Sequence, residues 1–431
     1  MVVILKDIQR QIEKCQQGPF IYPFYHNYCF SSIPHSILYL FGLQEKSPLS
    51  GILNKANVQQ TNSLKIVLFL IDGFGYKQWL QYADKYEFLR LFSKKGVVAP
   101  LTTIFPSTTA ATLATISTGL TPQEHGLPEY RVYFKELDRI IKTLRFSPLE
   151  GEGTDRLLEA GVDPKILFNE KTVYEVLSQF KIPSLTFLRE SYAKSVYARA
   201  TNRGSKTVTF INTSDLLVNL RNAIAETPSP AYFFVYWDGI DSIAHSYGLH
   251  TEQYLAELND FFYLLREELL QKLCGKKAEE ISLLVTSDHG QIDINPKKTV
   301  YLNQYRAVVD NLRIGRSGNK IFPWGSPRDI FLAVKPQKIN ETLDLLKRIL
   351  KEEAKVVTTE CMLKDGLFGR GALHKEFKSR VGDILILPYG NKTVWFEYFK
   401  GKKFKLLAVH GGLTPDEMLI PFAAARGDKL V

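Results

Sequence analysis

Residues 66–75 read IVLFLIDGFG, six apolar residues followed at once by Asp72 and a glycine-containing turn. An unbroken apolar run that ends in a turn is typical of a strand buried on both faces of a parallel sheet. Further runs of this kind lie at residues 183–188 (PSLTFL), 231–237 (AYFFVYW) and 281–287 (ISLLVTS). Helical patterns separate these runs. The alternation predicts an α/β fold with a mostly parallel central sheet and helices on both faces.

Acidic side chains follow three of the predicted strands. Asp72 follows the first strand, Asp241 lies shortly after residue 237, and Asp288 follows residue 287. In open α/β sheets ligands bind beyond the carboxyl ends of the strands, so we expect these carboxylates at one edge. A fourth apolar run, residues 406–409 (LLAV), ends in His410 and is predicted to reach the same edge.

The strand ends supply carboxylate and imidazole groups of the kind that bind divalent metal ions. The six candidates are Asp72, Asp241, His245, Asp288, His289 and His410. A catalytic zinc site uses about three protein ligands and keeps one position open, so six ligands suit two ions that share a substrate. Asp241 and His245 are four residues apart, which places both on one face if the segment is helical.

Each candidate ligand also has an ordinary structural explanation. An Asp after a strand is commonly a helix cap or a turn residue, which would account for Asp72 and the glycines that follow it. Asp241 and His245 can form a surface pair on a helix, and His410 can be a turn histidine. The metal-site interpretation therefore depends on all six residues meeting at one edge of the sheet.

A threonine-rich segment offers a nucleophile. Residues 102–127 read TTIFPSTTAATLATISTGLTPQEHGL, and they are predicted to form a loop that leads into a helix. A hydroxyl at a helix N-terminus is well placed, because backbone N–H groups hold an anion there and a nearby metal ion lowers the pKa of the hydroxyl. The candidates are Ser107, Thr108 and Thr109, with helix capping as the alternative explanation.

Five motifs, in this order, resemble those of the type I phosphodiesterase/nucleotide pyrophosphatase family of the alkaline phosphatase superfamily. They are IVLFLIDGFG, FPSTT followed by STGLTPQEHGL, DSIAHSYG, TSDHG and HGG. The resemblance covers residues 65–290 and 410–421 and implies an alkaline-phosphatase-like fold. Thr109 stands nine residues before Thr118, which is the spacing of the nucleophilic threonine in that family. The resemblance therefore favours Thr109 as the nucleophile, with Thr108 second.

The same resemblance implies two metal sites, with Zn²⁺ as the expected ion. One ion would be held by Asp72, Thr109, Asp288 and His289, and the other by Asp241, His245 and His410. Thr109 would attack phosphorus in line, and water would then hydrolyse the phosphothreonine. The resemblance thus implies a hydrolase of phosphodiester or pyrophosphate bonds in a small molecule such as a nucleotide.

The substrate contacts depart from the family pattern. Thr108 and Thr112 are the expected substrate-binding residues, but nucleotide-cleaving members carry an Asn where this chain has Thr112. A hydroxyl reaches less far than an amide, so the nucleotide preference stays open. Arg131 and Arg145 follow the motif that ends in residues 125–126. Exposed arginines are usually ordinary surface residues, and contact with a phosphate or a leaving group is the alternative.

Two other functions are compatible with the sequence. A phosphomonoesterase or a related phosphoryl or sulfuryl transferase can use the same scaffold. A non-catalytic protein that binds anions or nucleic acid could use the net charge of +10, from 55 Lys+Arg against 45 Asp+Glu. The basic residues are mixed with acidic ones and no nucleic-acid-binding motif is present, so no specific nucleic-acid binding is expected.

The length and composition indicate a globular protein with several parts. The 431 residues are 45% hydrophobic, which excludes a mostly disordered or fibrous chain. We expect residues 1–60 to form an N-terminal arm packed on the main domain. Residues 61–295 and 399–431 are expected to form the metal-binding catalytic domain, and residues 296–398 an inserted α+β subdomain.

The sequence carries no signal for export or membrane insertion. No cationic segment leads into an apolar run at the N-terminus, and no apolar stretch approaches the ~20 residues of a membrane span. The four cysteines, at positions 15, 29, 274 and 361, are too scattered for a disulfide framework. We therefore expect a cytoplasmic protein.

Overall fold

A seven-stranded sheet forms the centre of the protein in the computed structural model, which describes residues 5–61, 64–273 and 276–430. The strand order is β4-β20-β11-β3-β10-β8-β9. The bounds are β3 (Lys65–Ile71), β4 (Val97–Thr102), β8 (Ser184–Arg189), β9 (Lys206–Phe210), β10 (Ala231–Trp237), β11 (Ile281–Thr286) and β20 (Leu419–Arg426). In this sheet β20 runs in the direction opposite to the other six strands. The predicted α/β fold with a mostly parallel sheet is confirmed.

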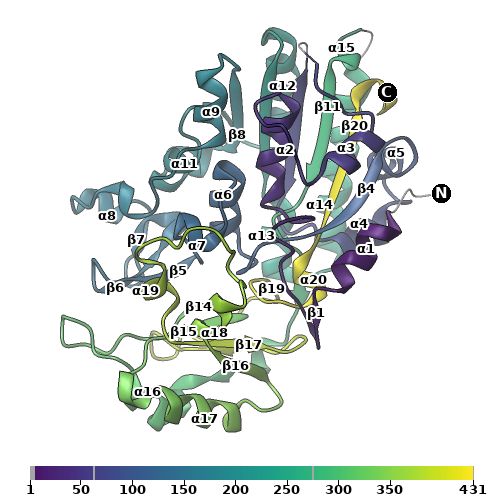
Figure 1. The fold of residues 1–431 in the computed structure, drawn as a ribbon. Coiled ribbons are helices and arrows are strands. Elements are labelled where there is room, and N and C mark those ends of the chain that lie inside the picture. The colour runs from purple at the N-terminus through teal and green to yellow at the C-terminus, as the bar shows by residue number, and fades with distance from the viewer. Residues whose placement is uncertain (1–4, 62–63, 274–275, 431) are drawn as a thin grey trace.

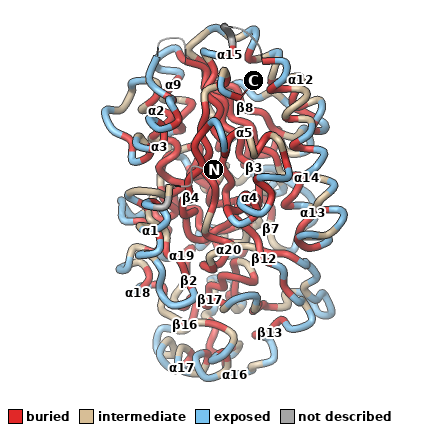
Figure 2. The backbone as a smooth tube through the Cα atoms, turned by 90° about the vertical axis from the view of Figure 1, so that its right-hand side faces the viewer, coloured by how far each residue is buried: buried red, intermediate tan, exposed pale blue. Residues whose placement is uncertain are grey.

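Helices cover both faces of this sheet (Figure 1). All residues of β3 are buried, and its side chains alternate between two hydrophobic clusters because successive strand residues point to opposite faces. One cluster includes α2 (Ser32–Leu40), α3 (Ser50–Lys55) and α9 (Val173–Gln179). The other includes α4 (Tyr76–Tyr82), α5 (Glu87–Lys95), α12 (Thr213–Glu226) and α14 (Glu252–Leu264). Figure 2 shows the buried backbone running through the middle of the molecule between these exposed layers.

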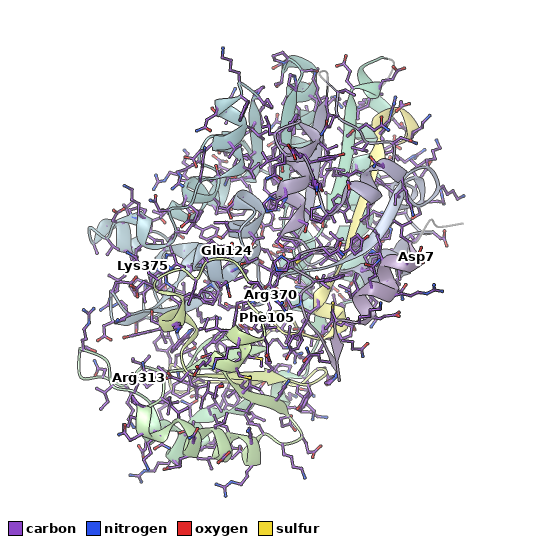
Figure 3. The ribbon with its side chains drawn as sticks, in the orientation of Figure 1. Asp7, Phe105, Glu124, Arg313, Arg370 and Lys375 are labelled. Atoms are coloured by element: carbon purple, nitrogen blue, oxygen red, sulfur yellow. The ribbon has the colours of Figure 1, made fainter. Side chains whose placement is uncertain are left out.

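The N-terminal segment packs against the loop that precedes α6 (Thr109–Thr118). It contains α1 (Lys6–Glu13), whose Asp7 lies at the right-hand edge of Figure 3, whereas Phe105 lies near the centre. The Tyr25 hydroxyl accepts a hydrogen bond from the Phe105 N–H at 3.1 Å and donates one to the Leu367 carbonyl at 3.0 Å. The ring of Phe105 lies 5.4 Å from that of Phe368. Three distant parts of the sequence therefore fix the position of this loop.

A second, antiparallel sheet lies in the lower part of Figure 1. Its order is β14 (Trp324–Ser326), β15 (Asp329–Leu332), β17 (Ile384–Pro388) and β16 (Ala354–Thr358), with α16 (Arg306–Asn311) and α17 (Ile339–Ile349) packed against it. Alternate strand residues and the apolar side of α17 form a separate hydrophobic cluster. The turn between β14 and β15 points Ser326 toward the carboxyl edge of the main sheet, where it contacts the His410 carbonyl at 3.4 Å.

One predicted strand is not part of the central sheet. Of residues 406–409, only the last two form a strand, β19 (Ala408–Val409), which pairs with β12 (Ile292–Asp293) in a separate two-stranded sheet. Leu406 and Leu407 are 37% and 36% exposed, so this apolar run is not a core strand. His410 therefore approaches the edge of the main sheet from outside it.

The other elements are short. Between residues 122 and 247 they are α7 (Pro122–His125), β5 (Arg131–Phe134), β6 (Arg139–Lys142), η1 (Thr143–Arg145), β7 (Ser147–Pro148), α8 (Arg156–Glu159), η2 (Pro164–Ile166), α10 (Glu190–Ala193), α11 (Val196–Thr201) and α13 (Gly239–Tyr247). The remainder are β1 (Gln16–Gln17), β2 (Phe20–Ile21), η3 (Leu265–Leu269), η4 (Leu270–Lys272), α15 (Lys276–Glu279), η5 (Pro296–Lys298), β13 (Val300–Tyr301), η6 (Leu302–Gln304), η7 (Pro336–Lys338), α18 (Thr359–Lys364), α19 (Phe377–Val381), β18 (Val394–Trp395), α20 (Pro415–Met418) and α21 (Gly427–Leu430).

In the described ranges, no helix has the length and apolar character needed to cross a membrane. Cys15, Cys29 and Cys361 are free thiols, and Cys274 lies outside the described residues.

Candidate active site

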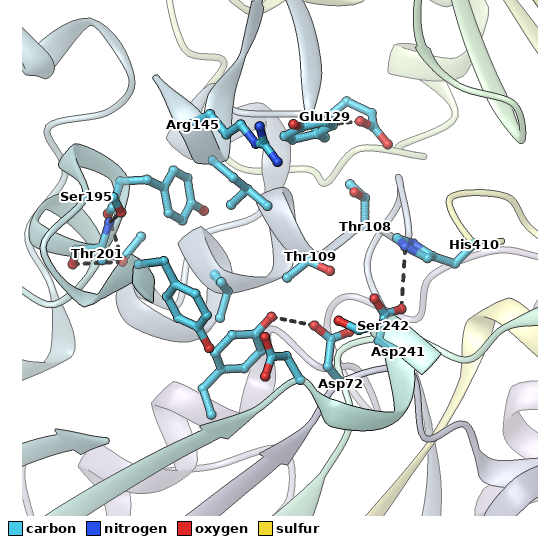
Figure 4. A pocket seen from close by; sticks show the side chains of 18 of the residues that line it. Asp72, Thr108, Thr109, Glu129, Arg145, Ser195, Thr201, Asp241, Ser242 and His410 are labelled. Carbon is cyan, nitrogen blue, oxygen red and sulfur yellow. Dashed lines mark hydrogen bonds and ion pairs between the residues drawn. The ribbon is translucent and has the colours of Figure 1, made fainter. Parts of the chain in front are cut away.

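Three strand ends bring carboxylates together beside the first turn of α6. Asp72 follows β3, Asp241 lies on α13 just after β10, and Asp288 follows β11. These strands are neighbours in the sheet and parallel, so their carboxyl ends meet at one edge. Figure 4 shows Asp72 and Asp241 on one side of Thr109, with His410 close to Asp241.

A first group of ligand atoms converges on His289. The Nε2 atom of His289 lies 3.4 Å from Asp72 Oδ1, 3.2 Å from Asp288 Oδ2 and 3.2 Å from Thr109 Oγ1. All of these side chains are buried, and the two carboxylate oxygens have no hydrogen-bond partner among the described residues. Buried carboxylate oxygens without a donor are costly unless a cation binds there, so this group fits a divalent metal ion.

A second group surrounds Asp241. The Nε2 atom of His245 lies 3.3 Å from Asp241 Oδ2, and that of His410 lies 4.0 Å from Asp241 Oδ1. The ring of His410 is stacked on that of His289 with centroids 3.6 Å apart. One ligand atom from each of Asp241, His289 and His410 lies within 4.8 Å of the other two. The same holds for one ligand atom from each of Asp72, Asp288 and His289. The two groups are therefore adjacent and share the space around His289.

The three histidines are oriented in the same way. The Nδ1 atom of His245 bonds to the Ala408 carbonyl at 2.7 Å, and that of His410 to the Ser107 carbonyl at 2.9 Å. His289 Nδ1 lies 3.1 Å from the Gly290 carbonyl. A carbonyl only accepts, so Nδ1 carries the proton and Nε2 keeps a lone pair that faces the carboxylates. Metal-binding histidines are commonly fixed in this manner.

The charges of the site are also those of a cation site. Burial raises the pKa of Asp72 well above its usual range, and the neighbouring carboxylates of Asp288 and Asp241 add to the effect. Burial raises the pKa of Asp241 to about 6 and lowers that of His289 to about 3. Burial, followed by repulsion from His289 and His245, lowers the pKa of His410 well below its usual value. A bound divalent cation favours the ionised carboxylate, so it would offset the raised pKa values of the aspartates. It also favours the neutral imidazole, which agrees with the lowered pKa values of the histidines.

Neighbouring side chains hold the carboxylates in place. The Tyr236 hydroxyl donates to Asp72 Oδ2 at 2.5 Å, the Gly73 N–H donates to Asp288 Oδ1 at 3.1 Å, and the Gln291 amide donates to Asp241 Oδ1. Sequence reasoning did not find Tyr236 or Gln291. Tyr236 lies inside a predicted strand and Gln291 three residues after Asp288, and only the tertiary structure determines that their polar ends reach the ligands.

The three candidate hydroxyls have different surroundings. Thr109 is the first residue of α6 and lies against His289, whereas Thr108 is the extended residue before the helix. Both line the pocket. Ser107 is fully buried, and its hydroxyl donates to the Gly412 carbonyl at 2.8 Å. The position of Thr109 at a helix N-terminus beside candidate metal ligands favours it as the nucleophile.

Thr112 does not reach the pocket, unlike Thr108. It is fully buried on α6, and its hydroxyl donates to the backbone carbonyls of Thr108 and Thr109, each at 3.1 Å. A threonine inside a helix often bonds to the preceding turn in this way. Its donor is therefore occupied by the backbone in this structure, and the substrate contact that we expected for Thr112 stays a prediction.

The site opens into a pocket of about 670 Å³. Beyond the ligands, its walls include Tyr192 and Thr201 on or beside α10 and α11, Arg131 and Arg145 near the β5–β6 hairpin, and Ser326 from the second sheet. Figure 4 shows Thr109 between Asp72 on one side and Arg145 and Glu129 on the other. The pocket therefore extends from the candidate ligands past Thr109 to Arg145 and Glu129.

His125, from the motif that follows α6, has a structural role. It is fully buried, its Nε2 atom bonds to the Thr115 hydroxyl at 3.1 Å, and its Nδ1 atom accepts from the Leu127 N–H at 3.1 Å. His125→Ala is expected to lower the free energy of unfolding by about 2–4 kcal/mol at pH 7, because both buried partners lose their bond. Urea unfolding followed by circular dichroism measures this.

The pH dependence of the same variant has a defined sign. Burial lowers the pKa of His125 to about 3, and the charges of His374 and Arg380 act in the same direction. The unfolded chain takes up this proton near pH 6.5, so the wild-type protein loses stability as the pH falls from about 6.5 toward 3. The difference between wild type and His125→Ala should shrink by about 2 kcal/mol between pH 7 and pH 5. A difference that does not change with pH contradicts this assignment.

A mostly parallel α/β sheet with buried carboxylates and imidazoles at its carboxyl edge, beside a threonine at a helix N-terminus, defines an alkaline-phosphatase-like protein. The chain belongs to the type I phosphodiesterase/nucleotide pyrophosphatase family, because the family model matches residues 66–413. This confirms the family predicted from the motifs. Its members are hydrolases that act on phosphate esters.

Solved structures share this fold. Murine ectonucleotide pyrophosphatase/phosphodiesterase 5 has a TM-score of 0.61 and 18% identity, over 84% of this chain and 88% of that chain. An inactive variant of the murine protein in complex with AMP has a TM-score of 0.60 and 17% identity, over the same shares. Phosphonoacetate hydrolase from Sinorhizobium meliloti, in complex with phosphonoacetate, has a TM-score of 0.61 and 15% identity, over 87% of this chain and 96% of that chain. No curated protein matches the sequence.

Proposed function

We propose that this protein hydrolyses phosphodiester or pyrophosphate bonds of a small molecule such as a nucleotide, through a phosphothreonine at Thr109. The observation that carries the proposal is the position of the Thr109 hydroxyl oxygen, 3.2 Å from His289 Nε2 at the N-terminus of α6. A hydroxyl in that position can attack a phosphorus atom held at the helix N-terminus, where backbone N–H groups stabilise the phosphate oxygens.

The residues that would hold metal ions are the two groups of ligands. Asp72, Thr109, Asp288 and His289 would hold one ion, and Asp241, His245 and His410 the other, with Zn²⁺ preferred because the donors are imidazole nitrogen and carboxylate oxygen. Two such ions supply positive charge to the attacking and leaving oxygens of an in-line displacement. Tyr236 and Gln291 would keep Asp72 and Asp241 in the orientation that this requires.

The chemistry that the chain itself performs is a two-step substitution at phosphorus. In the first step the Thr109 oxygen forms a bond to phosphorus and loses its proton, and the leaving group departs with the electron pair of its bond. In the second step water attacks the phosphothreonine, the bond to Thr109 breaks, and the threonine takes up a proton again. Thr109 is thereby regenerated and one water molecule is consumed.

Metal content and hydrolysis test the proposal together. Protein purified without chelator is expected to contain about two zinc-like ions per chain and to hydrolyse bis-p-nitrophenyl phosphate, and EDTA should remove both the ions and the activity. Fewer ions together with no hydrolysis would contradict the proposal. A preference of more than about tenfold for the monoester p-nitrophenyl phosphate would indicate a phosphomonoesterase instead.

A further inference from the structure

Two arginines line the pocket that also contains Asp72 and Thr109. Arg131 is the first residue of β5 and Arg145 is the last residue of η1, and both contribute to the pocket that contains Thr109. In the view of Figure 4, Thr109 lies between Arg145 and Asp72. Neither arginine belongs to the candidate ligand groups, so their positive charge is additional to the residues around Thr109.

The hairpin gathers like charges. Arg131 is paired directly with Lys142 across the antiparallel strands β5 and β6. Like charges in directly opposite positions destabilise a hairpin, so this pairing has a cost in the free protein. Burial lowers the pKa of Lys142, and the positive charges of Arg145 and Arg131 lower it further. The three cations are therefore close enough to repel one another, and an anion bound among them would relieve the repulsion.

The guanidinium groups retain free donors. Within the described ranges, the side chains of Arg131 and Arg145 have no recorded ion pair or hydrogen-bond acceptor. The Arg131 guanidinium lies 5.1 Å from the ring of Tyr130 and 5.0 Å from that of Trp395. Contact with rings occupies the flat faces of a guanidinium and leaves the in-plane N–H donors available. Those donors match the paired oxygens of a phosphate.

The carboxylate of Glu129, beside Arg131, is already engaged in hydrogen bonds. Glu129 is 1% exposed, and its carboxylate accepts from the backbone N–H groups of Tyr130 and Arg131. Burial raises the pKa of Glu129 to about 7, although the charge of Arg131 acts in the opposite direction. The hydrogen bonds of this carboxylate to Tyr130 and Arg131 come from backbone N–H groups, and none comes from a guanidinium.

The backbone of Arg145 is held firmly while its side chain is exposed. Its carbonyl accepts from the Asp155 N–H at 2.7 Å and from the Ser147 hydroxyl at 3.0 Å. Arg131 is fixed by its strand and its ring contacts. The two positive groups are thus presented from fixed backbone positions at the pocket wall, which lowers the entropy lost when a ligand orders them.

We infer that Arg131 and Arg145 form a second anion site, which binds a phosphate next to the phosphorus that Thr109 attacks. This inference rests on the proposed function and narrows its substrate class to molecules with a pyrophosphate bond, such as nucleoside polyphosphates. Arg131 and Arg145, for which the sequence left an ordinary surface role and a phosphate contact both open, then determine which phosphate ester is preferred.

Kinetics on a matched pair of substrates test the inference. ATP carries further phosphates beside the bond cleaved to AMP and pyrophosphate, whereas bis-p-nitrophenyl phosphate carries none. In Arg145→Ala the ratio of kcat/KM for ATP to kcat/KM for bis-p-nitrophenyl phosphate is expected to fall about 10- to 100-fold, the effect of losing charge-assisted hydrogen bonds. Arg131→Ala should change the ratio in the same direction, and Arg145→Lys should restore part of it.

Arg139→Ala is the matched control, because Arg139 is exposed on the same hairpin but does not line the pocket. Its ratio should equal that of the wild type. An unchanged ratio in both Arg145→Ala and Arg131→Ala, or wild-type protein that cleaves bis-p-nitrophenyl phosphate but not ATP, would overturn the second anion site and leave the proposed function standing.

If the wild-type protein cleaves neither substrate, the proposed function fails, and calorimetry with inorganic pyrophosphate decides the anion site separately. The dissociation constant is expected to rise about tenfold or more in Arg145→Ala but not in Arg139→Ala. Equal affinities in the wild type and Arg145→Ala, or no binding to the wild type, would contradict the site.

Discussion

Thr109→Ala is expected to reduce kcat on bis-p-nitrophenyl phosphate by on the order of 10⁴-fold or more, because it removes the oxygen that attacks phosphorus. The helix should persist, since alanine is the best helix former and the hydrogen-bond partner of the Thr109 hydroxyl is His289 Nε2. The other six candidate ligands are unchanged, so the metal content measured by atomic spectrometry should stay close to that of the wild type. Loss of turnover without loss of metal distinguishes a nucleophile from a structural residue.

Two further variants make this test specific. Thr109→Ser keeps a hydroxyl at the same position and should retain measurable turnover, with a phosphoserine trapped by acid quenching. Thr112→Ala lies one turn further along α6, where the hydroxyl bonds only to backbone carbonyls, and its turnover should be close to that of the wild type. Wild-type activity in Thr109→Ala would move the nucleophile to Thr108, which also lines the pocket.

The central strands could be predicted because their own sequence determines their burial. The run at residues 231–237 forms β10 with the same bounds, and all of its residues are buried. The run at residues 406–409 looked similar, but half of it is exposed. Its place in the sheet is taken by β20, which contains Pro421 and three consecutive alanines and therefore resembles no typical strand.

The candidate metal ligands could be predicted from the sequence because they follow recognisable strands. The residues that hydrogen-bond to these ligands could not be predicted in this way. Asp72 and Asp288 directly follow buried strands, and the chain direction alone places them at the carboxyl edge. The contacts of Tyr236 and Gln291 depend on which neighbouring strand or loop each side chain faces. The family pattern gives the position of Thr112 on the helix, but it does not give the bonds of its hydroxyl to the Thr108 and Thr109 carbonyls.

A buried ion pair joins the second sheet to the loop that carries His410. Arg328, between β14 and β15, donates from Nε and Nη2 to the two carboxylate oxygens of Glu417, each at 2.9 Å, and both side chains are 0% exposed. Glu417 also accepts from the Gly412 N–H at 3.0 Å and from the Thr414 hydroxyl at 2.6 Å. One carboxylate therefore fixes the turn that follows His410 and anchors it to the second sheet.

Glu417→Gln is expected to lower the free energy of unfolding by about 3–5 kcal/mol, because it leaves the Arg328 charge buried without a counter-charge. Burial alone would raise the pKa of Glu417, but Arg328 and the hydrogen bonds hold it below its usual value. The unfolded carboxyl therefore binds a proton first, so this contribution is present above about pH 4.5 and is lost as the pH falls further. Urea unfolding at several pH values measures both effects.

A double variant distinguishes the effect of an unpaired buried charge on stability from the effect of the Arg328–Glu417 contact on the position of His410. Arg328→Met with Glu417→Leu removes both charges, and most of the lost stability should return because no ion is left buried alone. Activity should not return with it, since neither new side chain can bond to Gly412 and hold the turn after His410. A stable double variant with full turnover would mean that packing of the second sheet positions His410 without the ion pair. If Glu417→Gln lowers the free energy of unfolding by less than about 1 kcal/mol, water reaches the Arg328 charge in that variant.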